Sequence, residues 1–139
     1  MELTPLEMPA SPELRRLVAE HLGWHMRKVW VGSRGVEYDY IVYDNNDRHI
    51  FQQEITAADL QDEPAAAEAV WLAAMRDDNC PRWDEDLNDA TWLVVGQDYK
   101  IWREGDRACA WVGTPEHAAC AATEALALVR AWLLFTQAR

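Results

Sequence analysis

Apolar residues recur at helical spacing in three parts of the chain, and each part follows residues that favour a helix start. The first follows Ser11-Pro12-Glu13, where serine can cap a helix, proline suits its first turn and the acid suits its positive end. The second is expected within 63–76, capped by Asp62, and the third is expected to open at Thr114-Pro115-Glu116. The three predicted stripes are Leu14, Leu17, Val18 and Leu22; Ala67, Val70, Trp71, Ala74 and Met75; and Ala119, Ala122, Leu126, Val129 and Leu133.

Two other regions are rich in aromatic and β-branched residues and are divided by turn residues. In the first, residues 28–31, 36–43 and 49–53 predict three antiparallel strands. Asp44-Asn45-Asn46-Asp47 has the composition of a hairpin turn, and Gly32-Ser33-Arg34-Gly35 is interpreted as another, because it lacks the lysine and the following helix of a phosphate-binding loop.

In the second region, residues 90–95, 99–103 and 107–112 predict three more strands, with Gly96-Gln97-Asp98 and Glu104-Gly105-Asp106 as turns. Apolar residues occupy both the odd and the even positions of these strands, whose side chains point to opposite faces. This pattern is expected for a sheet with helices on both faces. The opposed sets are Trp92 and Val94 against Leu93 and Val95, and Cys109 and Trp111 against Ala110 and Val112.

The order of these elements predicts an α+β fold, in which an antiparallel sheet has helices packed on its faces as an α-β-α sandwich. The order is a leading helix followed by two units of three strands and a helix, αβββα-βββα. We expect a single domain over 1–139, with an irregular segment at 1–10 and an acidic connecting loop at 77–89.

Charge and tryptophan content narrow the function classes. The chain has 24 Asp and Glu against 13 Lys and Arg, a net charge of −11, and eight tryptophans. A surface of this sign disfavours direct binding to nucleic acids or anionic membranes, which need clustered cations. Cys80, Cys109 and Cys120 are an odd number without CxxC spacing, so a secreted disulfide framework is not favoured, and a cytoplasmic protein is expected.

Two patterns suggest metal binding, and both are incomplete. Asp84, Asp86 and Asn88 alternate like the start of a calcium loop, but Asp89 stands where the loop needs glycine and Val95 where it needs glutamate. A solvated acidic loop is the preferred interpretation.

His117 and Cys120 would lie one turn apart on the last predicted helix, but zinc normally requires four such ligands. No motif marks Cys80, Cys109 or Cys120 as a nucleophile. The sequence therefore predicts neither an enzyme nor a cofactor or metal site.

Three segments resemble the phage ABA sandwich domain, a family of small phage and prophage proteins without a settled activity. They are Leu17-Val18-Ala19-Glu20 running to Gly23-Trp24, Ile55-Thr56-Ala57-Ala58-Asp59 before the alanine-rich segment with Val70-Trp71, and Thr114-Pro115-Glu116-His117-Ala118-Ala119-Cys120. The resemblance implies an α-β-α layered fold and an origin in mobile genetic elements. It implies no catalytic residues.

A binding function fits the acidic charge and the aromatic content best. Trp83 lies inside the acidic segment, where an exposed ring beside carboxylates would suit a basic protein surface. The residues predicted to bind a partner are Asp77, Asp78, Trp83, Asp84, Glu85, Asp86 and Asp89. Five of the tryptophans, Trp71, Trp92, Trp102, Trp111 and Trp132, are expected in the core, while Trp24 and Trp30 are less easily placed.

The leading hypothesis is a non-enzymatic, phage-type protein that inhibits a host defence system, as anti-CRISPR proteins and DNA mimics do. It would act in the host cytoplasm by docking its acids on a basic, nucleic-acid-binding surface of a host protein. The alternative is a phage structural or assembly protein that self-associates, for example as a homodimer. A third hypothesis is a small hydrolase with an unrecognised site.

Overall fold

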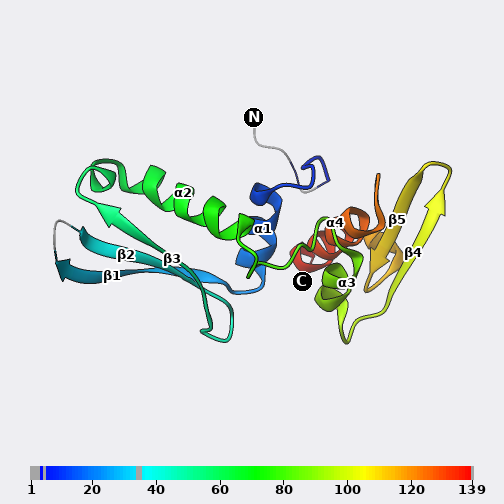
Figure 1. Ribbon diagram of the computed structural model, residues 1–139. Helices are drawn as coiled ribbons and strands as arrows, with labels where there is room; N and C mark the ends of the chain where they lie inside the picture. Colours follow the sequence, from blue (N-terminus) through cyan, green and yellow to red (C-terminus); the bar gives the residue numbers. More distant parts are fainter. Residues whose placement is uncertain (1–3, 5, 34–35, 139) are drawn as a thin grey trace. The chain divides into compact units, whose positions relative to one another are not determined.

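Four α-helices and two three-stranded antiparallel sheets make up the computed structural model, which describes residues 4, 6–33 and 36–138 (Figure 1). This content confirms the predicted α+β fold with helices packed on antiparallel sheets. The chain divides into two compact units. Unit A is Ala19–Cys80, and unit B combines Met1–Val18 with Pro81–Arg139. Within the described part of the chain, no helix is long and apolar enough to span a membrane.

Unit A contains β1 (His25–Ser33), β2 (Val36–Tyr43) and β3 (His49–Thr56), which pair in that order. They confirm the three strands predicted in this region, although β1 and β3 are longer than predicted. The predicted turn at 32–35 lies partly outside the described residues. A short 3₁₀ helix, η1 (Asp59–Asp62), leads from the sheet into α2 (Glu63–Arg76).

The turn between β2 and β3 is organised by Asp44, as its composition predicted. The Asp44 carboxylate accepts hydrogen bonds from the backbone N–H groups of Asn46 at 2.8 Å and Arg48 at 2.9 Å. Asp47 adopts a positive φ of 60°, a conformation that short polar residues tolerate better than most.

Helix α2 packs on one face of this sheet and begins at its predicted cap. The Asp62 carboxylate accepts a hydrogen bond from the backbone N–H of Ala65 at 3.2 Å. The strand register places Tyr40, Val42 and Ile55 on one face, and all three are buried. The buried residues of α2 are Val70, Trp71, Ala74 and Met75, which belong to the predicted stripe.

Helix α1 (Pro12–His21) follows its predicted start, because the Ser11 hydroxyl accepts a hydrogen bond from the backbone N–H of Leu14 at 3.2 Å. The strand predicted at 90–95 is wrong. Residues there form the end of α3 (Leu87–Thr91) and a 3₁₀ helix, η2 (Trp92–Val94). A short apolar run fits either a strand or a helical turn, and the cap formed by Asp86 favours the helix.

Two strands of unit B, β4 (Tyr99–Glu104) and β5 (Arg107–Val112), confirm the prediction. The third, β6 (Ala119–Ala121), lies where a helix was predicted. The Thr114 signal opens only a 3₁₀ turn, η3 (Pro115–His117). The last helix, α4, comes later.

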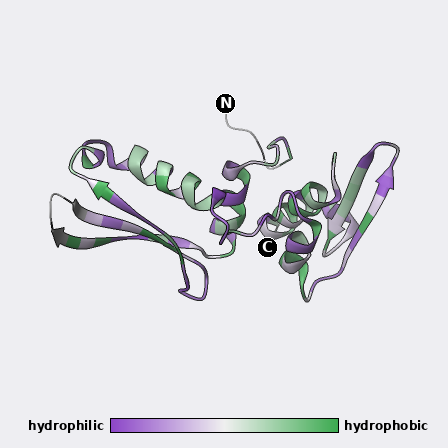
Figure 2. Ribbon diagram, in the orientation of Figure 1, coloured by the Kyte–Doolittle hydropathy of each residue, from purple (hydrophilic) through white to green (hydrophobic). Residues whose placement is uncertain are grey.

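Helix α4 (Glu124–Gln137) begins after Thr123, whose hydroxyl accepts a hydrogen bond from the backbone N–H of Leu126 at 3.2 Å. The predicted order of three strands followed by a helix is therefore present in this region. The strands are β4, β5 and β6 rather than the predicted set, and α3 is an additional helix before them. Hydropathy colouring shows apolar residues along both α2 and α4 (Figure 2). The buried residues of α4 are Ala125, Leu126, Ala127, Leu128, Val129, Ala131, Trp132 and Leu133.

The two faces of the β4-β5-β6 sheet have different roles. Buried Ala108, Ala110 and Val112 share one face, and α4 packs against β5 and β6. Cys109 points to the opposite face, where it forms a disulfide with Cys120. Buried residues therefore occur on both faces of β5 because one face packs against α4 and the other carries the disulfide. The prediction attributed them to a helix on each face.

Candidate interaction surface

The middle of the acidic segment is built into the core of unit B. Trp83 is 3% exposed and Asp84 is 1% exposed. The Asp84 carboxylate pairs with Arg15 Nε at 2.7 Å and accepts a hydrogen bond from the backbone N–H of Ser11 at 2.7 Å. The expectation that Trp83 presents an exposed ring to a partner is therefore wrong, and Asp84 stabilises the packing of α1.

The other acids of the segment also make local contacts. The Asp77 carboxylate accepts a hydrogen bond from the backbone N–H of Asn79 at 3.0 Å. The Asp89 carboxylate accepts one from the backbone N–H of Arg82 at 2.8 Å. Glu85 is exposed and lies 2.5 Å from Arg15 Nη2. The exposed acids of this segment are Asp78, Glu85 and Asp86.

These contacts also bear on the calcium pattern. Asp84 is already paired with a buried arginine, and Asp86 caps α3 through the backbone N–H groups of Asn88 and Asp89. The two carboxylates are thus used in local structure, which favours the interpretation of an ordinary acidic segment over a cation loop.

An exposed tryptophan, Trp92, does occur three residues after this segment. Its side chain is 72% exposed, and Val95 is 68% exposed. The sequence of 90–95 is typical of a strand, whose alternate residues would face a helix, and this pattern predicts that Trp92 lies in the core. The helical turn instead directs Leu93 and Val94 inward and leaves Trp92 and Val95 in solvent.

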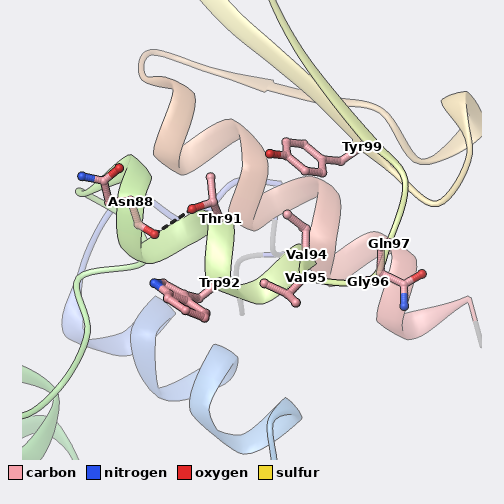
Figure 3. Close-up of a pocket in the computed structure, with 8 residues that line it drawn as sticks. All are labelled: Asn88, Thr91, Trp92, Val94, Val95, Gly96, Gln97 and Tyr99. Atoms are coloured by element: carbon pink, nitrogen blue, oxygen red, sulfur yellow. Dashed lines mark hydrogen bonds between the residues drawn. The ribbon is translucent and has the colours of Figure 1, made fainter.

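A hollow of about 500 Å³ lies between Trp92 and the start of β4. Figure 3 shows the residues that line it, with the Thr91 hydroxyl donating a hydrogen bond to the Asn88 carbonyl at 2.8 Å. Gly96, with a φ of 82°, turns the chain from η2 toward β4. The lining residues are Asn88, Thr91, Trp92, Val94, Val95, Gly96, Gln97 and Tyr99.

We call the exposed side chains of Trp92, Val95 and Tyr99, together with this hollow, the Trp92 surface. Two exposed acids lie next to its residues in the sequence. Asp86 caps the helix that carries Asn88, and Asp98 stands directly before Tyr99. An apolar centre with acidic neighbours has the composition of a protein-binding surface for a basic partner.

The chain shows no significant match to any protein-family model, curated protein or solved structure. The resemblance to the phage ABA sandwich domain therefore stays a prediction. Functional inference for this chain depends on the geometry of its own residues.

A second polar cluster lies in unit A, where Lys28 Nζ is 2.5 Å from Glu63 Oε1 and the Tyr40 hydroxyl donates to the same oxygen at 3.3 Å. The hydrogen bond from Lys28 lowers the pKa of Glu63 and raises the pKa of Lys28. Burial raises the pKa of Tyr40. Each shift moves the pKa of its group away from neutral pH, which favours the charged forms of Lys28 and Glu63 and hence the ion pair between them.

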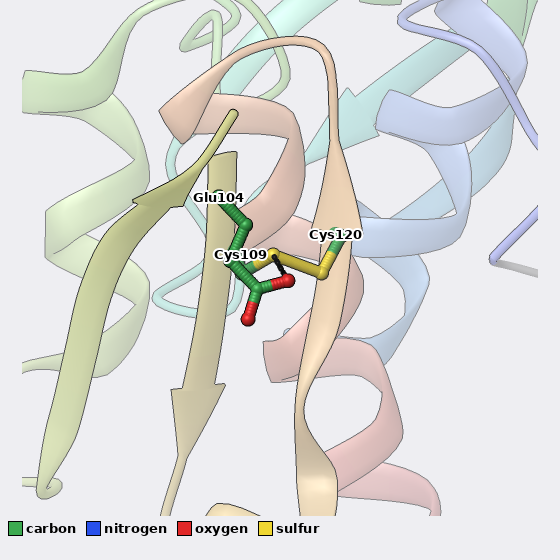
Figure 4. Close-up of side chains that lie close together, drawn as sticks. All are labelled: Glu104, Cys109 and Cys120. Carbon is green, nitrogen blue, oxygen red and sulfur yellow. Dashed lines mark hydrogen bonds between the residues drawn. A yellow bond between two sulfur atoms is a disulfide. The ribbon is translucent and has the colours of Figure 1, made fainter. Parts of the chain in front are cut away.

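The third cluster combines a carboxylate with the two bonded cysteines. Figure 4 shows Glu104 beside the disulfide between Cys109 and Cys120. Glu104 Oε2 lies 3.8 Å from Cys109 Sγ. The predicted neighbours His117 and Cys120 are not on one helix, since His117 ends η3 and Cys120 lies in β6. Sequence spacing could not reveal the cluster, because it depends on how β6 pairs with β5.

Proposed function

We propose that this protein is a non-enzymatic binding protein that docks its Trp92 surface on a basic surface of another protein. The observation that carries the proposal is the exposure of Trp92 beside a hollow whose residues have exposed acids next to them in the sequence. Tryptophan is among the residues that contribute most to protein interfaces when a partner covers it. A net charge of −11 would speed association with a basic partner and oppose binding to nucleic acid itself.

A narrower form of the proposal is that the partner is a nucleic-acid-binding host protein. Carboxylates would then occupy positions that phosphates otherwise take, and the protein would act in the host cytoplasm as an inhibitor of host defence. This form is supported by the charge and by the resemblance to phage proteins.

Binding to cationic peptides tests the general proposal. Two arginine- and lysine-rich peptides of equal charge, one with a central leucine and one with glycine in its place, are immobilised and titrated with the protein at low and high salt. We expect tighter binding to the leucine peptide, and weaker binding to both at high salt because exposed charges are screened. Salt-independent binding, or no preference for the leucine peptide, would contradict the proposal.

The variant Trp92→Ala identifies the surface, and Trp30→Ala is the matched control. Trp30 is 69% exposed and lies on β1 of unit A. We expect Trp92→Ala to weaken binding to the leucine peptide about 30-fold, the loss typical of a central interface tryptophan, and Trp30→Ala to have little effect. The opposite ranking would place the binding surface on unit A.

Self-association is a second candidate, favoured by a specific feature of β1. This strand lies at an edge of its sheet, and its residues Val29, Trp30 and Val31 are exposed. An exposed apolar edge strand can pair with the same strand of a second copy. Sedimentation over a concentration series should then show a dimer that Val31→Lys disrupts, whereas a monomer at all concentrations would exclude this candidate.

A further inference from the structure

The Glu104, Cys109 and Cys120 side chains form a set of potential metal ligands on one face of the β4-β5-β6 sheet. Cys109 is directly opposite Cys120 in the register of β5 and β6, and Trp102 is directly opposite Cys109 in the register of β4 and β5. Glu104 is two residues after Trp102, so it points to the same face. Three donor groups from three strands thus meet at one place (Figure 4).

The three side chains are close enough to share one small thiophilic cation once the disulfide is reduced and its two sulfurs have moved to about 3.8 Å apart, as in a tetrahedral zinc site. One donor atom from each of the three residues lies within 4.8 Å of the other two. In a tetrahedral zinc site, a sulfur ligand and a carboxylate oxygen are about 3.6 Å apart, given the usual bond lengths. The separation of 3.8 Å between Cys109 Sγ and Glu104 Oε2 is close to this value.

Neighbouring donors already orient the carboxylate. Trp102 Nε1 donates to Glu104 Oε1 at 3.3 Å, and Arg107 Nη2 donates to Glu104 Oε2 at 3.2 Å. Both donors hold the Glu104 carboxylate on the same face of the sheet as the two cysteines. Each carboxylate oxygen has a second lone pair, so Glu104 can keep both donors while it binds a cation.

We propose that the reduced form of this chain binds a zinc-class divalent cation through Cys109, Cys120 and Glu104, with a fourth position open to water. The disulfide is first reduced by a dithiol: the sulfur–sulfur bond breaks, each cysteine takes one proton, and the dithiol becomes a disulfide. Metal binding then releases both thiol protons, since thiolates are the ligands. Oxidation and metal binding thus exclude each other at this site.

Cobalt is the probe, because Co²⁺ takes tetrahedral zinc sites and absorbs visible light. The whole chain is reduced with a phosphine, which is then removed under nitrogen. Once circular dichroism shows that the reduced chain is folded, it is titrated with Co²⁺ and then with Zn²⁺. We expect a thiolate-to-cobalt absorption band with one ion per chain, displaced by Zn²⁺. The oxidised chain should give no such band. Absence of the band from the folded, reduced chain would overturn the proposal.

Three variants assign the ligands. Cys80→Ser is the matched control, because Cys80 is a buried cysteine of unit A that lies outside the disulfide, and it should leave the band unchanged. The double variant Cys109→Ser/Cys120→Ser should lose the band. Glu104→Gln keeps both cysteines and should weaken Co²⁺ binding at least tenfold, the order of loss that even outer-sphere partners cause. A band that persists in the double variant, or is unaffected by Glu104→Gln, would contradict the assigned ligand set.

Discussion

Arg15 and Asp84 form a buried ion pair in unit B, with Arg15 Nε 2.7 Å from Asp84 Oδ1 and side chains that are 5% and 0% exposed. The pair connects α1, which carries Arg15, to the acidic segment, which carries Asp84, 69 residues later in the chain. Asp84 also accepts a hydrogen bond from the Ser11 backbone N–H, which precedes α1. The acidic segment is therefore important for stability as well as for surface charge.

Replacement of Asp84 by alanine should strongly destabilise the protein. The change leaves the Arg15 guanidinium buried without its main partner, and loss of one member of a buried pair typically costs about 3–5 kcal/mol. Urea denaturation followed by circular dichroism measures the change. The control is Glu85→Ala, which removes an exposed partner of the same arginine and should cost less than about 1 kcal/mol. Equal effects of the two variants would contradict the structural role of Asp84.

The close approach of Gly113 to Phe135 predicts a second stability effect. A Cβ atom at Gly113 would lie 2.5 Å from the Phe135 ring, and Gly113 has a φ of 79°. Gly105 also has a positive φ, 65°, but has open space around it. Gly113→Ala should therefore destabilise the protein by about 1–3 kcal/mol more than Gly105→Ala, since only the first adds a packing clash to the backbone strain. Thermal melts of both variants measure this difference, and equal melting temperatures would contradict the contact.

Local chemistry was sufficient to predict the three strands and helix α2 of unit A. The Asp44 turn and the Asp62 cap act over four residues or fewer, so a single sequence reveals them. Unit B was harder because similar local signals had different outcomes. Thr114 and Thr123 both accept hydrogen bonds from backbone N–H groups, but only Thr123 starts a long helix. The pairing of 119–121 with β5 decides between them, and this pairing depends on contacts distant in sequence.

The candidate site was predicted only in part. The acidic segment was expected to carry the exposed tryptophan, and the structure buries Trp83 and exposes Trp92 instead. The difference arises because a helical turn directs successive residues around an axis, whereas a strand alternates them between two faces. The Glu104 cluster could not be predicted from spacing, because the strand register brings its members together.

The ion pair between Lys28 and Glu63 predicts a pH dependence of stability. The pKa of Glu63 is lowered, so its contribution is complete above the ordinary value of 4.5 and is lost as pH falls through the lower folded value. The pKa of Lys28 is raised, so its contribution is complete below 10.5 and is lost as pH rises through the higher folded value. The difference in melting temperature between the wild type and Glu63→Gln should therefore be largest between these limits.

Melting temperatures measured at pH 3 and pH 7 are a direct test of this expectation. The two proteins should differ most at pH 7, and the difference should shrink at pH 3, which lies below the ordinary Glu pKa of 4.5. The control compares Lys28→Gln with the double variant Lys28→Gln/Glu63→Gln, neither of which has the ion pair. The difference in melting temperature between these two variants should depend little on pH. A constant difference between wild type and Glu63→Gln across the range would contradict the ion pair.

The contrasting burial of Trp83 and Trp92 predicts opposite results for two alanine variants. Trp83→Ala should destabilise the protein by about 3–5 kcal/mol, because it removes a large ring from a packed environment. Trp92→Ala should change the free energy of unfolding by less than about 0.5 kcal/mol, because the ring is mostly in solvent. Urea denaturation of the purified variants gives both values. An unchanged Trp92→Ala stability also ensures that any loss of peptide binding reflects the missing ring and not unfolding. A large loss of stability in Trp92→Ala would mean that Trp92 packs in the core, and the proposed docking surface would then lose its central residue.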